Sequence, residues 1–266
     1  SNPTGTLSSM VYMAYNQRSL FVTGVWTTVQ LALAGTAIAF VLALLMVFLR
    51  IQEPDKHNND FVKLIKIVAN KFARFYIFVI RGTPMMVQSL IFYYAIFNLF
   101  KRTGMSVTEI NRVWSLFISG LVTVSLNSTA YLAEVLRGGI LAVDAGQMEA
   151  ARSLGMTHWQ AMRRVVFPQA IKNSLPAIGN EFIINIKDSS VLCVLGVSDL
   201  MFMTRSVAGI YYKGTECYLI AATVYLFLTY LSSLLLKTIT GRMTAPDNTK
   251  RRQGNQTVDL GLPSSN

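Results

Sequence analysis

The chain has 266 residues, of which 52% are hydrophobic and only 14% are charged, whereas about a quarter of the residues of a soluble domain are charged. Four stretches contain no charged residue and are at least about as long as the roughly 20 residues that cross a bilayer as a helix: 19–49, 82–100, 113–133 and 217–236. This composition excludes an ordinary soluble protein. The net charge of +11 would point to nucleic acid in a soluble protein, but here we expect no nucleic-acid partner.

The basic residues are distributed unevenly between the loops. Sixteen Lys and Arg residues fall in the segments 50–74, 137–172 and 237–252, whereas six fall in the loops that alternate with these. Basic residues concentrate in cytoplasmic loops. We therefore expect the N-terminus outside the cell and the C-terminus in the cytoplasm, which requires an odd number of spans.

The N-terminal part of the chain is expected to contain two spans. Residues 1–18 form a short extracytoplasmic segment, either an exposed tail or an interfacial lead-in to the span at 19–49. Pro84 lies near the start of the second span and is expected to kink it, because proline cannot donate a backbone hydrogen bond. Arg81 lies close to the inner membrane face, where a structural or gating role is expected.

Three further spans complete the predicted all-α membrane fold of five transmembrane helices. The fourth, at 174–198, is apolar but interrupted by Glu181, Lys187 and Asp188. Together the spans define one transmembrane domain at 19–240, followed by a polar cytoplasmic tail at 241–266 that we expect to be flexible. Cys193 and Cys217 are expected to be small buried hydrophobic side chains.

The cytoplasmic loop at 142–170 contains the most informative pattern. Gly155 follows a predicted helix at the place where a helix end favours a positive φ. Thr157 and Gln160 then have the spacing of a capping box for a second helix that runs to Pro168. The pattern predicts an amphipathic helix–turn–helix, in which Met156 and Trp159 are available for contacts; an ordinary interfacial helix is the alternative.

The sequence of this loop resembles a known signature. Glu149, Ala150 and Ala151, three further residues, Gly155, nine further residues and then the run 165–168 (VVFP) resemble the EAA motif of the permeases of bacterial type I ATP-binding-cassette importers. Phe167, where the family prefers Leu, is the only departure. The resemblance implies that this element is the coupling helix that fits a groove on the ATPase, between the third and fourth spans.

Further segments resemble the branch of that family that imports polar amino acids: 81–84 (RGTP), 131–140 (YLAEVLRGGI), 179–181 (GNE) and 186–190 (IKDSS). The resemblance covers about residues 19–240. It implies a dimer with a second copy or a relative, two ATPase subunits that bind ATP and Mg²⁺, an extracytoplasmic substrate-binding protein, an amino acid substrate and the bacterial plasma membrane. The amino acid itself stays open.

Polar residues follow helical spacing on two of the predicted spans. Ala177, Glu181, Asn185 and Asp188 share one face of the fourth span, and another set does so on the third: Thr123, Asn127, Tyr131 and Glu134. Two such stripes are what a water-filled translocation path needs. Alternatively, the amides join helices through interhelical hydrogen bonds.

The charged residues of the spans have different expected roles. Glu134 and Arg137, three residues apart, are expected to form an ion pair, and Lys187 and Asp188 either neutralise each other or pair across a dimer. Glu181 has no basic residue three or four positions away. Because a charge inside a membrane is costly unless it has a function or a partner, we hypothesise that Glu181 holds a cationic group of the substrate.

Several kinds of site are absent from the sequence. No Gly-Lys dipeptide occurs, so the phosphate-binding loop that requires it is missing, and we expect no enzymatic activity, no cofactor and no metal site in this chain. An ion-gradient-driven amino acid transporter is the alternative function, although no related halves are visible. A membrane-embedded enzyme is a more distant alternative, because Glu181 and Asp188 lie two helical turns apart and nothing there would activate a nucleophile.

Overall fold

The computed structural model describes residues 5–51 and 59–243, and every regular element within these ranges is a helix. In chain order the helices are α1 (Thr6–Asn16), α2 (Arg18–Ile51), α3 (Asp60–Gly82), α4 (Met85–Arg102), α5 (Val107–Val113), α6 (Leu116–Leu141), α7 (Ala145–Ser153), α8 (His158–Ala161), the π-helix η1 (Met162–Val166), α9 (Phe167–Asp188), the 3₁₀-helix η2 (Ser189–Val194), α10 (Leu200–Tyr211) and α11 (Gly214–Met243). The predicted all-α fold is confirmed. The predicted flexible tail lies almost wholly outside the described residues.

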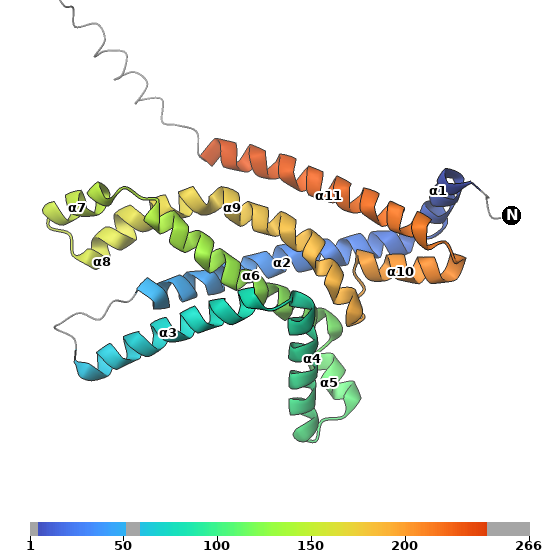
Figure 1. Ribbon diagram of the computed structural model, residues 1–266, viewed down its shortest axis with the longest axis horizontal. Helices are drawn as coiled ribbons and strands as arrows, with labels where there is room; N and C mark the ends of the chain where they lie inside the picture. The colour runs from blue at the N-terminus through green and yellow to red at the C-terminus, as the bar shows by residue number, and fades with distance from the viewer. Residues whose placement is uncertain (1–4, 52–58, 244–266) are drawn as a thin grey trace, which may run out of the picture.

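The long helices run side by side in an elongated bundle, with α7 and α8 at one end and α1 and α10 at the other (Figure 1). α2, α6 and α11 are each long and apolar enough to cross a membrane, and each overlaps a predicted span. Ala39, Ala43 and Val47 of α2 belong to the same buried cluster as Leu132 and Leu136 of α6. The small side chains on α2 let the two helices approach closely.

The second predicted span is bent far more than a kink. α3 lies beside α2 and α6, whereas α4 turns away from α3 by 114°. The break is located at Thr83 and Pro84, both of which have extended backbone angles. Proline restricts its own φ and disfavours the helical conformation of the residue before it. α3 therefore ends at Gly82, and the expected kinked helix is a pair of helices.

The fourth predicted span also differs from the structure. The sequence predicted a helix that ends near Pro168 and a separate span at 174–198, whereas α8, η1 and α9 follow one another without a gap. Pro168 lies in the first turn of α9, a position at which a missing backbone N–H costs little. Beyond Asp188 the α-helix is followed by the more tightly wound 3₁₀-helix η2. The segment that resembles a coupling helix is thus continuous with a helix that packs against α2, α6 and α11.

The N-terminal segment is not simply an exposed tail. α1 packs against α11, and its Ser9 and Met13 side chains are buried there. Met13 belongs to the same apolar cluster as Phe21, Leu200 and Cys217. The opposite side of α1 stays exposed, so the lead-in to the first span is an ordered helix at the end of the bundle far from α7 and α8.

Candidate functional site

The predicted helix–turn–helix is present in the segment between α6 and α9. α7 ends at Ser153, and Gly155 adopts a φ of +83°, a conformation that glycine takes at no steric cost. Thr157 then caps α8: its hydroxyl accepts a hydrogen bond from the backbone N–H of Gln160, whose side chain accepts one from the N–H of Thr157. The capping box thereby satisfies two backbone N–H groups at the start of α8.

This element presents a mixed surface to a partner. Glu149 and Ala150 are exposed, whereas Ala151 is buried against the rest of the loop. Leu154 is 81% exposed, and sequence reasoning missed it because a leucine inside a helical pattern is usually expected to pack. Burial of this side chain by another protein would be favourable, because apolar surface gains free energy on leaving water.

Other parts of the loop hold the element onto the bundle. The Trp159 ring packs edge-on against Phe48 of α2, with 5.8 Å between the ring centroids. The Gln169 side chain of α9 donates to the Gln147 side chain of α7 at 3.3 Å. Met156 is half-buried and its carbonyl accepts a hydrogen bond from Arg152. A displacement of α7 and α8 would therefore move α9 with it, since packed helices move as rigid bodies.

Asn185 joins three helices in the interior of the bundle. Its Nδ2 donates to Thr36 Oγ1 of α2 at 2.8 Å, and its Oδ1 accepts from the Ser128 hydroxyl of α6 at 2.9 Å. Both bonds are buried. The partner on α6 is Ser128 rather than a member of the predicted polar stripe, so the two stripes do not meet at this level.

Asn127 supports the bend between α3 and α4. Its Nδ2 donates to Gln88 Oε1 at 3.0 Å, and Gln88 Nε2 in turn donates to the carbonyls of Ile80 and Thr83 at 2.8 and 2.9 Å. Gln88 thereby satisfies backbone acceptors that the end of α3 leaves without helical partners. No pattern in the sequence indicates a role for Gln88, which is a single amide in an apolar run. The hydroxyl of buried Thr123 donates within its own helix.

Glu181 is a buried carboxylate in the interior of the bundle. Glu181 is only 7% exposed, and it forms no salt bridge with any other described residue. The Ser128 hydroxyl lies beside this carboxyl, and its one proton is donated to Asn185. Lys187 and Asp188 are exposed at the end of α9, and neither forms an ion pair with another described residue.

Charged side chains make two further sets of contacts between the helices, one around Glu134 and one at Arg81. Glu134 forms ion pairs with Arg137, at 2.9 Å, and with Arg50 at the end of α2. The pair expected within α6 is therefore present and is extended to a second helix. The guanidinium of Arg81 lies 5.3 Å from the centre of the Tyr131 ring, so these two side chains form a cation–π contact. In the described part of the chain, no group of side chains is arranged to hold a metal ion.

Known proteins with similar sequences are transport permeases. Residues 63–245 match the family described as "Binding-protein-dependent transport system inner membrane component". The glutamine transport system permease protein GlnP of Escherichia coli is 34% identical over 176 residues, which cover 66% of this chain and 76% of that protein. The nopaline transport system permease protein NocM of Agrobacterium fabrum is 31% identical over 214 residues, which cover 79% and 82%.

Solved structures share the fold. A chain in the crystal structure of an amino acid ABC transporter with histidines superposes with a TM-score of 0.72 at 38% identity, covering 90% of this chain and 99% of that one. A chain of the MetNI methionine ABC transporter superposes with a TM-score of 0.65 at 20% identity, covering 85% and 96%, which supports the fold alone. The chain therefore belongs to the family of binding-protein-dependent transport system inner membrane components, as a multi-pass permease subunit of an ATP-binding-cassette transporter.

Proposed function

We propose that this chain forms the path through which an ATP-binding-cassette importer takes up a polar amino acid by alternating access. One observation carries the proposal: α9 holds the buried Glu181 and is continuous, through η1 and α8, with an exposed turn that resembles a coupling helix. A displacement at the turn therefore reaches the carboxylate through one rigid element. Such a direct connection is what the conversion of ATPase closure into substrate movement requires.

Glu181 is proposed to hold the ammonium group, or a basic side chain, of the substrate. A buried carboxylate is costly unless a cation neutralises it, and within the described residues no cation does so. The relatives named above transport glutamine and nopaline, both of which carry an amino acid moiety. Asn185, Asn127, Thr123, Tyr131 and Asp188 belong to the proposed path, but the hydrogen bonds of the two amides support an additional role in joining helices.

ATP and Mg²⁺ are proposed to bind to partner subunits that dock on α7 and α8. Glu149 offers a charge for a basic partner residue, Ala150 allows a close approach, and Leu154 offers an apolar anchor. The mutation Leu154→Asp is expected to abolish co-purification of the ATPase. Leu7→Asp is the matched control, because Leu7 is similarly exposed at the opposite end of the bundle.

A second permease, either a copy or a relative, is proposed to pack against α4. This helix projects from the bundle (Figure 1), and Ile91, Tyr94 and Leu99 on it are largely exposed. The end that carries α1 and α10 is proposed to face the outside of a bacterial plasma membrane and to receive a substrate-binding protein. The coupling end and the C-terminus then face the cytoplasm, in agreement with the distribution of basic residues.

Uptake into vesicles tests this function. The permease, its ATPase partner and its binding protein are reconstituted with ATP on the coupling side, and uptake of radiolabelled glutamine, histidine and arginine is measured. We expect uptake of at least one of these to require ATP and to persist when ionophores collapse all ion gradients. Uptake that does not depend on ATP and is lost when ionophores are added would show that the protein is an ion-gradient-driven transporter instead.

A further inference from the structure

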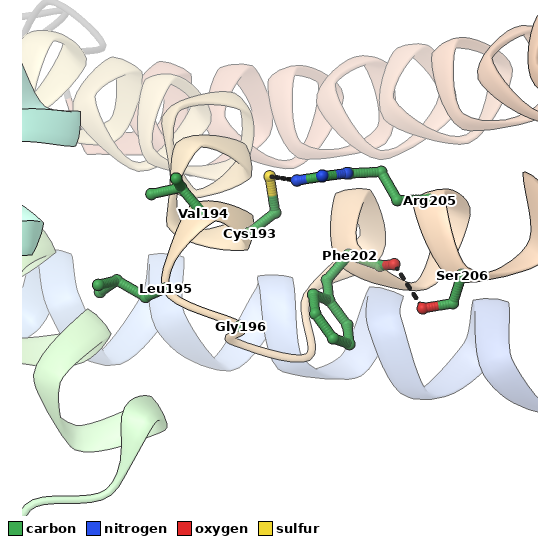
Figure 2. Close-up of a pocket in the computed structure, with 7 residues that line it drawn as sticks. All are labelled: Cys193, Val194, Leu195, Gly196, Phe202, Arg205 and Ser206. Carbon is green, nitrogen blue, oxygen red and sulfur yellow. Dashed lines mark hydrogen bonds between the residues drawn. The ribbon is translucent and has the colours of Figure 1, made fainter. Parts of the chain in front are cut away.

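A shallow, open pocket of about 440 Å³ lies between η2 and α10, away from the polar residues described above; it is called the cavity below. The turn at 193–196 forms one side of it, and Phe202, Arg205 and Ser206 of α10 form the other (Figure 2). Its size falls within the roughly 300–1,000 Å³ of small-molecule sites. The cavity lies at the end of the bundle opposite α7 and α8, where a substrate would enter from outside.

Arg205 is the charged group of this cavity. Its side chain extends across the cavity toward Cys193 (Figure 2), and Nη1 lies 3.8 Å from Cys193 Sγ, which is a weak contact. Within the described residues Arg205 pairs with no carboxylate. The Asp199 Oδ1 atom, on the preceding turn, is used by the backbone N–H of Phe202. A guanidinium has five N–H donors in a planar fork, so most of the capacity of Arg205 remains available for a ligand.

The walls suit the remainder of an amino acid. Val194, Leu195 and the Phe202 ring supply apolar surface, whereas the Ser206 hydroxyl donates to the carbonyl of Phe202 and keeps lone pairs for a ligand N–H. Both sides of the cavity are held in place. Gly196 turns the chain with a φ of +92°, and the backbone N–H of Leu200 donates to Thr28 of α2 at 3.1 Å.

We propose that this cavity is an outer binding site for the carboxylate of the transported amino acid, with Arg205 as its anchor. The planar guanidinium matches the geometry of a carboxylate and binds it through two parallel hydrogen bonds. The proposal rests on the function proposed above and specifies where the substrate enters. It assigns the negative end of a zwitterion to Arg205, as the interior site assigns the positive end to Glu181.

The two sites are used one after the other. Twelve residues separate Glu181 from Cys193, and the rise of an α-helix and a 3₁₀-helix places them roughly 20 Å apart. The charged groups of one amino acid are only a few ångströms apart, so a single molecule cannot reach both Arg205 and Glu181. The chain between them is a continuous helix, α9 followed by η2, along which a substrate released from the outer site travels to the inner one.

An acidic residue of a docking protein would satisfy Arg205 equally well as a charge. The cavity favours the small molecule, because its volume of about 440 Å³ exceeds what a single acidic side chain would fill. The two occupants predict different results when Arg205 is changed, as described below.

Cys193 serves as a natural reporter of occupancy. It lies in the cavity wall, whereas Cys217 is fully buried, and Cys217→Ser provides a background with a single cysteine in the chain. The rate at which a charged thiosulfonate reagent modifies Cys193 is measured with the purified complex in lipid. We expect histidine and arginine to slow the modification about tenfold or more, and their decarboxylated counterparts histamine and agmatine to have no effect.

The variants Arg205→Gln and Arg205→Lys identify the anchor. Arg205→Gln is expected to abolish protection by either amino acid, and Arg205→Lys to retain part of it, because an ammonium keeps the charge but loses the fork. Arg112→Gln, which changes an exposed arginine on α5, is the matched control. In this variant histidine and arginine should protect Cys193 as strongly as in the wild type. Melting temperatures of the variants verify that each is folded.

Three outcomes would overturn the assignment. Equal protection by acids and amines would show that the carboxylate is not recognised. Full protection in Arg205→Gln would show that another group holds it. Loss of stimulation by the binding protein in Arg205→Gln, with protection of Cys193 unchanged, would make Arg205 a docking contact. Absence of ATP-driven uptake of any amino acid by the wild type would instead disprove the proposed function, so the two failures are distinguishable.

Discussion

Glu181 is the single residue on which the proposed path depends most. Replacing Glu181 by Gln keeps the size of the side chain and removes its charge. We expect uptake to fall about tenfold or more, because a hydrogen bond to a charged group contributes about 1.5–3 kcal/mol. Radiolabelled uptake and co-purification of the ATPase are measured together, and assembly should be unchanged.

Glu216→Gln is the control for this change. Glu216 lies in the first turn of α11, away from α9, and its replacement should leave uptake at the wild-type rate. Normal uptake by Glu181→Gln, or an equal loss in both variants, would remove Glu181 from the path.

Asp199 controls a different property, the dependence of stability on pH. Burial raises the pKa of this carboxyl from 3.8 to about 6, and its Oδ2 has no hydrogen-bond partner among the described residues. Because the folded state binds this proton more tightly than the unfolded state, the stabilisation is fully present below about pH 4 and is lost as the pH rises through 6. The whole change amounts to about 3 kcal/mol.

Asp199→Asn tests this dependence. Asparagine caps α10 as well as aspartate does and carries no charge, so the variant should lack this fall in stability between pH 4 and 7 and should equal or exceed the wild type at pH 7. Melting temperatures across the pH range measure the difference. Asp144→Asn, at the exposed cap of α7, should show the same dependence of melting temperature on pH as the wild type. If the curve of Asp199→Asn also runs parallel to that of the wild type, Asp199 is not the cause of the fall in stability.

Adjacent glycines on α6 show how tightly the elements are packed. A Cβ at Gly139 would lie 2.6 Å from the Ala170 carbonyl oxygen and would also clash with Ser174 Oγ on α9, whereas a Cβ at Gly138 would meet nothing within 4 Å. We expect Gly139→Ala to destabilise the protein by about 1–3 kcal/mol, as overpacking does. Gly138→Ala should be neutral or slightly stabilising. Thermal unfolding of the two variants measures both effects, and equal melting temperatures would show that α6 and α9 are farther apart.

At the scale of elements, the sequence predicted most of what local rules control. Long uncharged runs located α2, α6 and α11, and the capping residues around Gly155 located the turn between α7 and α8. The angle between α3 and α4 was not predictable, because Pro84 indicates a break but not its size. Its 114° bend depends on Gln88 and Asn127, which meet from helices far apart in the sequence.

At the scale of the whole molecule, the candidate site was predicted less completely than the fold. Helical spacing identified Asn127 and Asn185, but spacing does not give the rotation of a helix against its neighbours. The structure pairs Asn185 with Ser128 and Thr36, neither of which belongs to a predicted stripe. The outer cavity was missed for the same reason, since Arg205 and Cys193 come together only when α10 folds back along η2.

The central claim is that amino acid binding and ATP hydrolysis are coupled through this chain. Its most direct test is the ATPase rate of the complete complex in lipid, measured with its binding protein and a panel of amino acids. The account predicts that one chemical class of amino acid raises the rate and that Glu181→Gln abolishes the increase. An ATPase rate that no amino acid changes, or a chain that associates with no ATPase at all, would contradict it.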